Sequence, residues 1–374
     1  MTTASASHRT WVEVDGTALR HNLGVAQELA GPEGGVMAVV KADAYGLGVR
    51  TVVPALAAAG VPAFAVATLA EALELRALGV TAPVYALSPA LPEEQPGIVA
   101  ARGLIVPAVS SLEEAARYSA LATAAGTVLP VHVVFDTGMG RIGFVSPDLR
   151  EAVAQARQIA ALPGLAIDSV ASHFPSADED QAFTTRQWER YHALRHALAE
   201  AGVRPARHHV ANSAGTLTQP RADTEFVRTG LMLFGVSPVP EKQALLHEAI
   251  TWKARVVLVR TLPAGHGISY GRTFITTRPT RVATLAVGYA DGYPRHLSGQ
   301  GAWVGLGGQP CPVLGRVTMD QIMVEAPDSV HTGEAATLLG GNGPGATELA
   351  TQAGTIPYEL FCGLGRRVAR ILKP

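Results

Sequence analysis

Polar residues that could take part in catalysis stand directly after short apolar runs at five places in this sequence. Functional side chains of parallel α/β barrels lie where strands end and loops begin. A lysine at such an end can form an imine, and arginines and small polar residues beside it can bind anions. The five places are Lys41, "DTGMGRIG" (136–143), "SHFPSAD" (172–178), "HHVANSAGT" (208–216) and "RTG" (228–230).

Each of these residues alone also has an ordinary structural explanation. Lys41 could be a solvated rim residue, although burial by the aliphatic run before it would favour the neutral, nucleophilic amine. The segments "ANSAG" and "RTG" could be simple turns. Alternatively, their backbone N–H groups could bind a phosphate near the start of a helix. Arg141 could be exposed, or it could anchor a carboxylate or phosphate. Together, a lysine, a phosphate site and cationic anchors suggest a site for pyridoxal phosphate.

Composition and charge exclude several other classes of protein. The chain has 374 residues, of which 48% are hydrophobic and 16% charged, so a well-buried globular protein of more than one domain is expected. Thirty basic and thirty-one acidic residues give a net charge of −1, which does not indicate a nucleic-acid or membrane partner. The only two cysteines, Cys311 and Cys362, fit a reducing compartment.

Targeting and membrane segments are also not expected. The first ten residues, "MTTASASHRT", lack the apolar region of a secretory signal. The uncharged stretch Thr51–Ala70 is long enough to span a membrane, but Pro54, Gly60 and Pro62 interrupt it. We therefore predict a cytoplasmic protein.

Apolar runs alternate with longer amphipathic segments between residues 10 and 236. The runs are unbroken rather than alternating, as the buried strands of a parallel sheet require, and their number fits an α/β fold with a (β/α)₈ TIM-type barrel. An open doubly wound sheet is the alternative, although its glycine fingerprint is missing. The expected strands are Trp11–Val14, Val36–Val40, Ala63–Ala67, Pro83–Leu87, Leu104–Val109, Pro130–Phe135, Ile167–His173, His208–Ala211 and Phe226–Arg228.

The sequence pattern changes after Val236. Short β-type runs such as "ARVVLVRTL" and "RVATLAVGY" are separated by glycines and prolines, and only "TELATQAG" (347–354) indicates a helix. We predict a barrel over residues 10–246 and a C-terminal β-rich domain over residues 247–374, against which residues 1–14 can pack.

Nine segments resemble, in order, the motifs of the alanine-racemase-type pyridoxal phosphate enzymes. "AVVKADAYGLG" resembles the family's cofactor-lysine segment, and the resemblance covers about residues 10–372. It implies an alanine racemase that binds pyridoxal phosphate and interconverts L- and D-alanine, supplying D-alanine for peptidoglycan. The other segments are "DTGMGRIG", "SHF-SAD", "ANSAG", "VRTG-MLFG", "ISYGRTF", "VGYADGYPR", "GRVTMDQIMVE" and "IPYELFC".

The resemblance implies roles for individual residues. Lys41 would hold the cofactor as an internal aldimine and act as a base on one face of the substrate α-carbon. Tyr270 would act on the opposite face, from the partner subunit of a homodimer, because racemisation needs a proton acceptor and a donor on opposite faces. Arg228 would face the pyridine nitrogen, and His173 would connect it to Tyr270.

The remaining implied contacts involve the cofactor phosphate and the substrate carboxylate, and no metal ligand is among them. His209 would line the pocket, as would Tyr289, and the bulk of Tyr358 would favour small amino acids such as alanine and serine. The implied cofactor-binding residues are Tyr45, Asn212, Ser213, Gly230, Leu231 and Tyr358, and the implied substrate-binding residues are Arg141, Met319 and Tyr289.

One departure from the family pattern concerns Arg141. Many members carry a carbamylated lysine two residues before the "DTGMGR" aspartate, where it orients this arginine, but this chain has Val134. Another carboxylate, a bound anion or nothing would then hold Arg141. The alternatives to an alanine racemase are a broader amino-acid racemase, a decarboxylase of similar layout, a pyridoxal phosphate carrier without turnover, and a barrel without cofactor.

Overall fold

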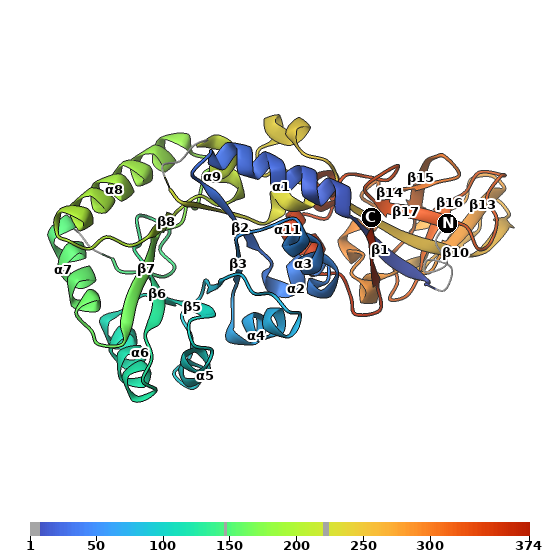
Figure 1. Ribbon diagram of the computed structural model, residues 1–374. Helices are drawn as coiled ribbons and strands as arrows, with labels where there is room; N and C mark the ends of the chain where they lie inside the picture. Colours follow the sequence, from blue (N-terminus) through green and yellow to red (C-terminus); the bar gives the residue numbers. More distant parts are fainter. Residues whose placement is uncertain (1–7, 146–147, 220–223) are drawn as a thin grey trace.

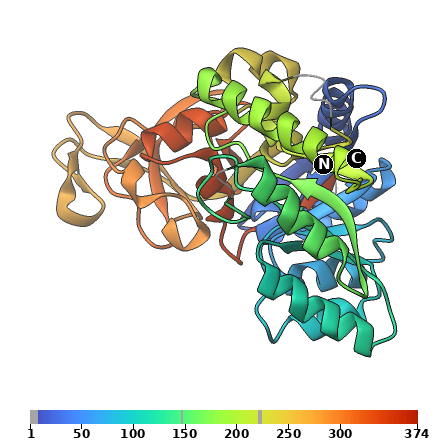
Figure 2. The ribbon, with the colours of Figure 1, turned by 90° about the vertical axis from the view of Figure 1, so that its left-hand side faces the viewer.

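Two domains of different architecture lie side by side in the computed structural model, which describes residues 8–145, 148–219 and 224–374 (Figure 1). The N-terminal domain is a closed barrel of parallel strands, and the C-terminal domain is built on an eight-stranded, mostly antiparallel sheet. Figure 2 shows the second domain as a separate lobe beside the barrel. Within the described ranges, every helix is too short or too polar to cross a membrane.

The barrel confirms the predicted fold class and excludes the open doubly wound sheet. The last strand pairs in parallel with the first, with Gly35 opposite Phe226, so the sheet closes on itself. The apolar strands are buried on both faces, as a barrel surrounded by helices requires. The strands are β2 (Gly35–Val39), β3 (Ala63–Val66), β4 (Val84–Ala86), β5 (Ile105–Val109), β6 (Leu129–Val134), β7 (Leu165–Ala171), β8 (Arg207–His209) and β9 (Phe226–Thr229).

Helices follow the barrel strands and cover the outside of the barrel (Figure 1). Several begin with a side-chain cap, such as Asp15 before the first helix and Ser111 before the sixth. The helices are α1 (Gly16–Ala30), α3 (Val49–Ala58), α4 (Leu69–Ala77), α5 (Gln95–Ala100), α6 (Leu112–Ala124), α7 (Leu149–Ala160), α8 (Gln181–Glu200) and α9 (Ser213–Thr218).

The first strand expected in the βα repeat lies outside the barrel. β1 (Thr10–Asp15) pairs antiparallel with β10 (Ile250–Leu262) and parallel with β18 (Ala369–Lys373), so it belongs to the C-terminal sheet. The barrel therefore begins at β2 and not at residue 10, and residues 10–14 pack with the C-terminal sheet, in line with the packing expected for the N-terminal segment. A short apolar run does not specify its partner strand, because the hydrophobic pattern of a buried strand is the same in either sheet.

The C-terminal sheet curls back on itself, because β13 (Thr280–Leu285) pairs with both β16 (Ile322–Glu325) and β10. The expected helix is present as α10 (Ala346–Gln352), and a second short helix, α11 (Pro357–Cys362), was not predicted. The remaining elements are β11 (Gly267–Ile268), β12 (Phe274–Ile275), β14 (Trp303–Leu306), β15 (Gln309–Leu314), β17 (Ala335–Leu339) and the 3₁₀ helices η2 (Leu231–Phe234), η3 (Pro240–Leu245), η4 (Tyr270–Arg272), η5 (Tyr289–Asp291) and η6 (Arg295–Leu297).

Candidate active site

A pocket of about 660 Å³ lies at the carboxyl ends of the barrel strands. Its walls come from the ends of β2, β3, β4, β6, β7, β8 and β9, from the segments that follow them, and from Ile356 and Tyr358 of the C-terminal domain, so residues far apart in the sequence meet there. Most of the residues singled out in the sequence line this pocket. They are Lys41, Tyr45, Arg141, His173, His209, Asn212, Ser213, Arg228, Gly230 and Tyr358.

A left-handed turn, α2 (Lys41–Tyr45), brings two of these side chains into the pocket. Ala42, Asp43, Ala44 and Tyr45 all have φ between +52° and +58°, a conformation that costs about 1–2 kcal/mol for each residue with a side chain. Glu71 holds the turn, because its carboxylate accepts hydrogen bonds from the N–H of Ala42 (2.7 Å) and of Ala67 (2.7 Å). The turn places Lys41 and Tyr45 at the same pocket.

Strain in this turn predicts an unusual effect of glycine. We expect Ala42→Gly to raise the free energy of unfolding by roughly 0.5–1 kcal/mol, because glycine adopts positive φ without a steric penalty. The matched control is Ala57→Gly, which lies exposed in the right-handed helix α3 and is expected to lower it by about 1 kcal/mol. Urea midpoints of both variants check this. Equal losses would show that the turn stores no strain.

The electrostatic environment of Lys41 favours its neutral form. Burial lowers the pKa of the amine, and the positive charges of Arg141 and Arg228 lower it further, while Glu71 acts in the opposite direction. Among the described residues, Asp136 is the only carboxylate that lines the pocket, and its oxygens already accept backbone N–H groups from the loop that follows. The pocket therefore combines a nucleophilic amine with a cationic surface that suits anions.

Arg228 is a buried cation whose hydrogen-bond partners are all uncharged groups. Its two terminal nitrogens donate to three carbonyl oxygens, at 2.8 to 2.9 Å, and to the Nδ1 atoms of His209 (2.7 Å) and His173 (2.9 Å). Burial lowers the pKa of the guanidinium to about 10, so it stays protonated at neutral pH. Five bonds to neutral acceptors leave the positive charge available to the pocket.

These bonds fix the protons on the two histidines, because a guanidinium can only donate. Nδ1 of His173 and of His209 must accept, so each ring carries its proton on Nε2. Burial, and next the charge of Arg228, hold the pKa of both rings well below the usual value, and both are neutral.

Asn212 does not accept a hydrogen bond from the Nε2–H group of His173. The Asn212 amide nitrogen lies 3.4 Å from Nε2 but donates to the carbonyl of Phe174 (3.0 Å), while its oxygen accepts from the N–H of Gly215 (2.9 Å). The two nitrogens that face each other are therefore both donors. Nε2–H of His173 is available to an oxygen atom in the pocket.

Small groups meet at the opposite wall of the pocket. The hydroxyl of Ser213 accepts a hydrogen bond from the N–H of Gly230 (3.0 Å). A Cβ atom at position 230 would lie 2.2 Å from the Tyr45 hydroxyl, so only glycine fits there. Leu231 is buried behind this wall and does not line the pocket, and burial raises the pKa of the Tyr358 hydroxyl to about 12. Two hydroxyl groups that lie close to a stretch of backbone in this way can hold a phosphate group.

Arg141 reaches the pocket without the support of a carboxylate. Val134 packs with Ala108, Ala171 and Ile142 in a small apolar cluster, where it cannot pair with a cation. No hydrogen bond or ion pair holds the Arg141 guanidinium within residues 8–145, 148–219 and 224–374. A bound anion is therefore the group with which Arg141 can pair in this pocket.

Tyr270, Tyr289 and Met319 lie on the C-terminal domain, and none of them lines the Lys41 pocket of the same chain. Their exposed fractions are 71%, 42% and 52%. Tyr289 and Met319 are neighbours, because the N–H of Tyr289 donates to Thr318 (3.0 Å) and the next N–H donates to the Met319 carbonyl (3.0 Å).

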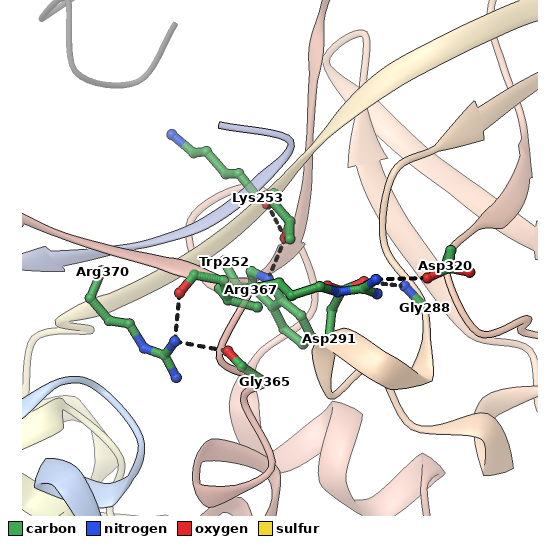
Figure 3. A network of polar contacts seen from close by, with 10 residues as sticks. Trp252, Lys253, Gly288, Asp291, Asp320, Gly365, Arg367 and Arg370 are labelled. Atoms are coloured by element: carbon green, nitrogen blue, oxygen red, sulfur yellow. Dashed lines mark hydrogen bonds and ion pairs between the residues drawn. The ribbon is translucent and has the colours of Figure 1, made fainter. Parts of the chain in front are cut away.

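A network of polar contacts holds the loops that carry Tyr289 and Met319 (Figure 3). Arg367 donates to both oxygens of the buried carboxylate of Asp291, at 3.0 and 3.2 Å, and to Asp320 (2.8 Å). Asp291 also accepts from the N–H of Gly288 (3.0 Å). Arg370 of the same network donates to the carbonyl of Gly46, just after the Lys41 turn, and so links the two domains.

Both domains match known protein families along most of the chain. Residues 14–238 match the family described as "Alanine racemase, N-terminal domain", and residues 249–372 match "Alanine racemase, C-terminal domain". The chain belongs to the alanine racemase family. The alanine racemase of Symbiobacterium thermophilum is 42% identical over 370 residues, which is 96% of each chain.

Solved structures of the alanine racemase family share the whole fold. That of the enzyme from D-cycloserine-producing Streptomyces lavendulae has a TM-score of 0.90 and 36% identity, covering 98% of this chain and 97% of the other. That from Bartonella henselae, described with covalently bound pyridoxal phosphate, has a TM-score of 0.87 and 28% identity, covering 98% and 99%. The predicted family, fold class and enzyme class, an amino-acid isomerase, are thereby confirmed.

Sequence reasoning missed two residues of the site. Glu71 anchors the Lys41 turn, and the spacing of Thr68 and Glu71, which form a capping box, was the available signal. His132 is fully buried in the pocket wall, where Nε2 bonds the Ala86 carbonyl (2.9 Å) and Nδ1 has no partner among the described residues. A single histidine inside the apolar run "PVHVV" was its only sequence signal.

Proposed function

We propose that this chain interconverts L- and D-alanine with bound pyridoxal phosphate. A single observation carries the proposal: a half-buried lysine with a lowered pKa shares a pocket with Arg141 and Arg228, and the one carboxylate that lines this pocket among the described residues, Asp136, is already bonded to backbone. Such a pocket suits a cofactor that has both an aldehyde and anionic groups. The related enzymes named above are alanine racemases, and one of them is described with this cofactor.

The residues of the pocket fit the cofactor from end to end. Lys41 would hold it through its amine, and Arg228 would face its ring nitrogen, as the buried guanidinium already faces the pocket. The phosphate would lie where the hydroxyls of Tyr45 and Ser213 meet the backbone of Gly230, with Leu231, Tyr358 and Asn212 beside it. When bound, the cofactor withdraws electrons and so makes the substrate α-hydrogen acidic.

Proton transfer then depends on side chains of this protein. Burial, and next the charge of Arg141, lower the pKa of Lys41 and so favour the neutral amine, the form that accepts a proton as a general base. Because Arg228 remains charged, it opposes protonation of a ring nitrogen placed before it. Nε2–H of His173 can donate to a phenol oxygen, and we assign that oxygen to Tyr270.

A homodimer would supply the second base. Racemisation needs proton transfer on both faces of the α-carbon, and Tyr270 stands exposed, outside the pocket of its own chain. We propose that Tyr270, Tyr289 and Met319 enter the pocket of a second subunit. Arg141 and the backbone N–H of Met319 would then hold the substrate carboxylate, and Tyr358 would limit its side chain. Supply of D-alanine for peptidoglycan is the proposed physiological role.

Proton NMR of L-alanine in D₂O, with enzyme and cofactor, tests the proposal. We expect loss of the α-proton signal together with formation of D-alanine. Lys41→Ala and Tyr270→Phe should each reduce turnover by at least about 10²–10⁴-fold, the range of a general base. The matched control is Tyr118→Phe, which removes a buried hydroxyl that has no hydrogen-bond partner among the described residues and should leave turnover unchanged.

Other outcomes would identify what is wrong. Exchange of the α-proton without inversion would mean that only one face is served, and the role given to Tyr270 would fail. Exchange with several other amino acids at comparable rates would favour a broader racemase. If no amino acid exchanged although the cofactor bound, the carrier alternative would replace the enzyme.

A further inference from the structure

Tyr270 projects from a turn that must direct it, within the described part of its own chain, without a side-chain hydrogen bond. The turn joins β11 to β12, and the Tyr270 side chain is 71% exposed. Its hydroxyl makes no hydrogen bond within the part of the chain that the structure describes. Its direction is therefore set by the backbone of residues 269–272.

That backbone is strained on both sides of Tyr270. Ser269 has φ 62° and ψ −175°, a region that only glycine occupies readily, and Arg272 has φ 48°. Gly271, with φ 70°, relieves the strain at only one position. In a free chain such a conformation of serine is disfavoured by roughly tenfold or more, so the surrounding structure must hold it.

The hydroxyl of Ser269 supplies one part of that support. It donates a hydrogen bond of 2.6 Å to the carbonyl of Arg316, in the loop after β15. Close packing supplies another part, because a Cβ atom at Gly315 would lie 2.6 Å from the Ile268 carbonyl. Finally, the N–H of Arg272 closes the turn on the Ser269 carbonyl (3.1 Å).

The base of the turn is firmly anchored in the domain. Ile268 is buried in a cluster with Leu262, Val282 and Leu314, and Phe274 packs against the same cluster. A change in the hydroxyl of Ser269 can therefore alter the turn without unfolding the hairpin. Ser269 therefore carries both the strained backbone conformation and the hydrogen bond that supports it, and it directly precedes Tyr270, the proposed base.

We propose that Ser269 is a positioning residue: its hydrogen bond to Arg316 holds the strained turn that aims Tyr270. This inference rests on the proposed function, since it concerns the base assigned to Tyr270. It makes a distinctive prediction, because glycine can adopt the strained conformation without the hydrogen bond, whereas alanine cannot do so freely.

The test compares Ser269→Ala and Ser269→Gly as holoenzymes. We expect Ser269→Ala to lower kcat for alanine by about tenfold at nearly unchanged KM, the loss of one supporting hydrogen bond. Ser269→Gly should stay within about threefold of the wild type, because its backbone reaches the same conformation. A serine that acted only through its hydroxyl contact would make the two variants equally poor, and that result would overturn the proposal, as would full activity of Ser269→Ala.

Isotope effects provide a second readout that general loosening would not reproduce. With α-deuterated L- and D-alanine, Ser269→Ala should raise the primary isotope effect for one enantiomer and lower it for the other, because only the Tyr270 face is slowed. Equal changes for both enantiomers would contradict a positioning role. Tyr270→Phe separates the two proposals: full activity of that variant would end the proposed function, whereas its inactivity beside a fully active Ser269→Ala would end this inference alone.

Discussion

Replacement of Arg228 by lysine is expected to lower the free energy of unfolding by about 2–6 kcal/mol, because an ammonium has three donors and Arg228 makes five hydrogen bonds. At least two of the five hydrogen bonds would be lost, and each buried acceptor left without a partner costs about 1–3 kcal/mol. The positive charge is kept, so the loss reports on the planar geometry of the guanidinium alone.

Urea denaturation of both proteins measures this loss. The control is Arg117→Lys, at a partly exposed residue of α6 with one ion pair to Glu113, for which we expect a change below about 0.5 kcal/mol. If Arg228→Lys unfolded at the same urea concentration as the wild type, water or a rearranged neighbour would have to satisfy the acceptors, and the described network would not be rigid.

Acidification below pH 6.5 is expected to destabilise the protein strongly. Three histidines are buried and neutral at the pocket: burial lowers the pKa of His132 to about 4, and burial with the charge of Arg228 holds the pKa of His173 and His209 well below 6.5. The unfolded chain then binds protons that the folded chain excludes, so the stability present above pH 6.5 is lost as the pH falls below that value.

The size of the loss follows from the number of histidines. Each contributes up to about 1.4 kcal/mol per pH unit, so the three together should lower the free energy of unfolding by about 3–4 kcal/mol between pH 6 and pH 5. Urea midpoints of the protein at pH 7, 6 and 5 measure this. His132→Gln should reduce the slope by about a third. A flat profile would mean that the buried rings are already protonated.

The sequence by itself determined the class of the barrel and most of the pocket. Unbroken apolar runs predicted buried parallel strands, and polar residues at their carboxyl ends must converge once those strands form a barrel. Lys41, Arg141, His173, Asn212 and Arg228 could therefore be predicted to share one site. The order of the nine motifs also indicated the protein family, which the residue types at the strand ends alone could not specify.

Only the tertiary structure decided where β1 pairs, how the Lys41 turn is built and what surrounds Arg228. The sequence of β1 resembles that of a barrel strand, but its partners are β10 and β18. These partners lie more than two hundred residues away, and the local sequence does not specify such distant pairing. The left-handed turn contains no glycine between Lys41 and Tyr45, so its positive φ values contradict local preference and depend on Glu71. The protons of His173 and His209 follow from Arg228, because a guanidinium can only donate and its burial brings both rings within reach.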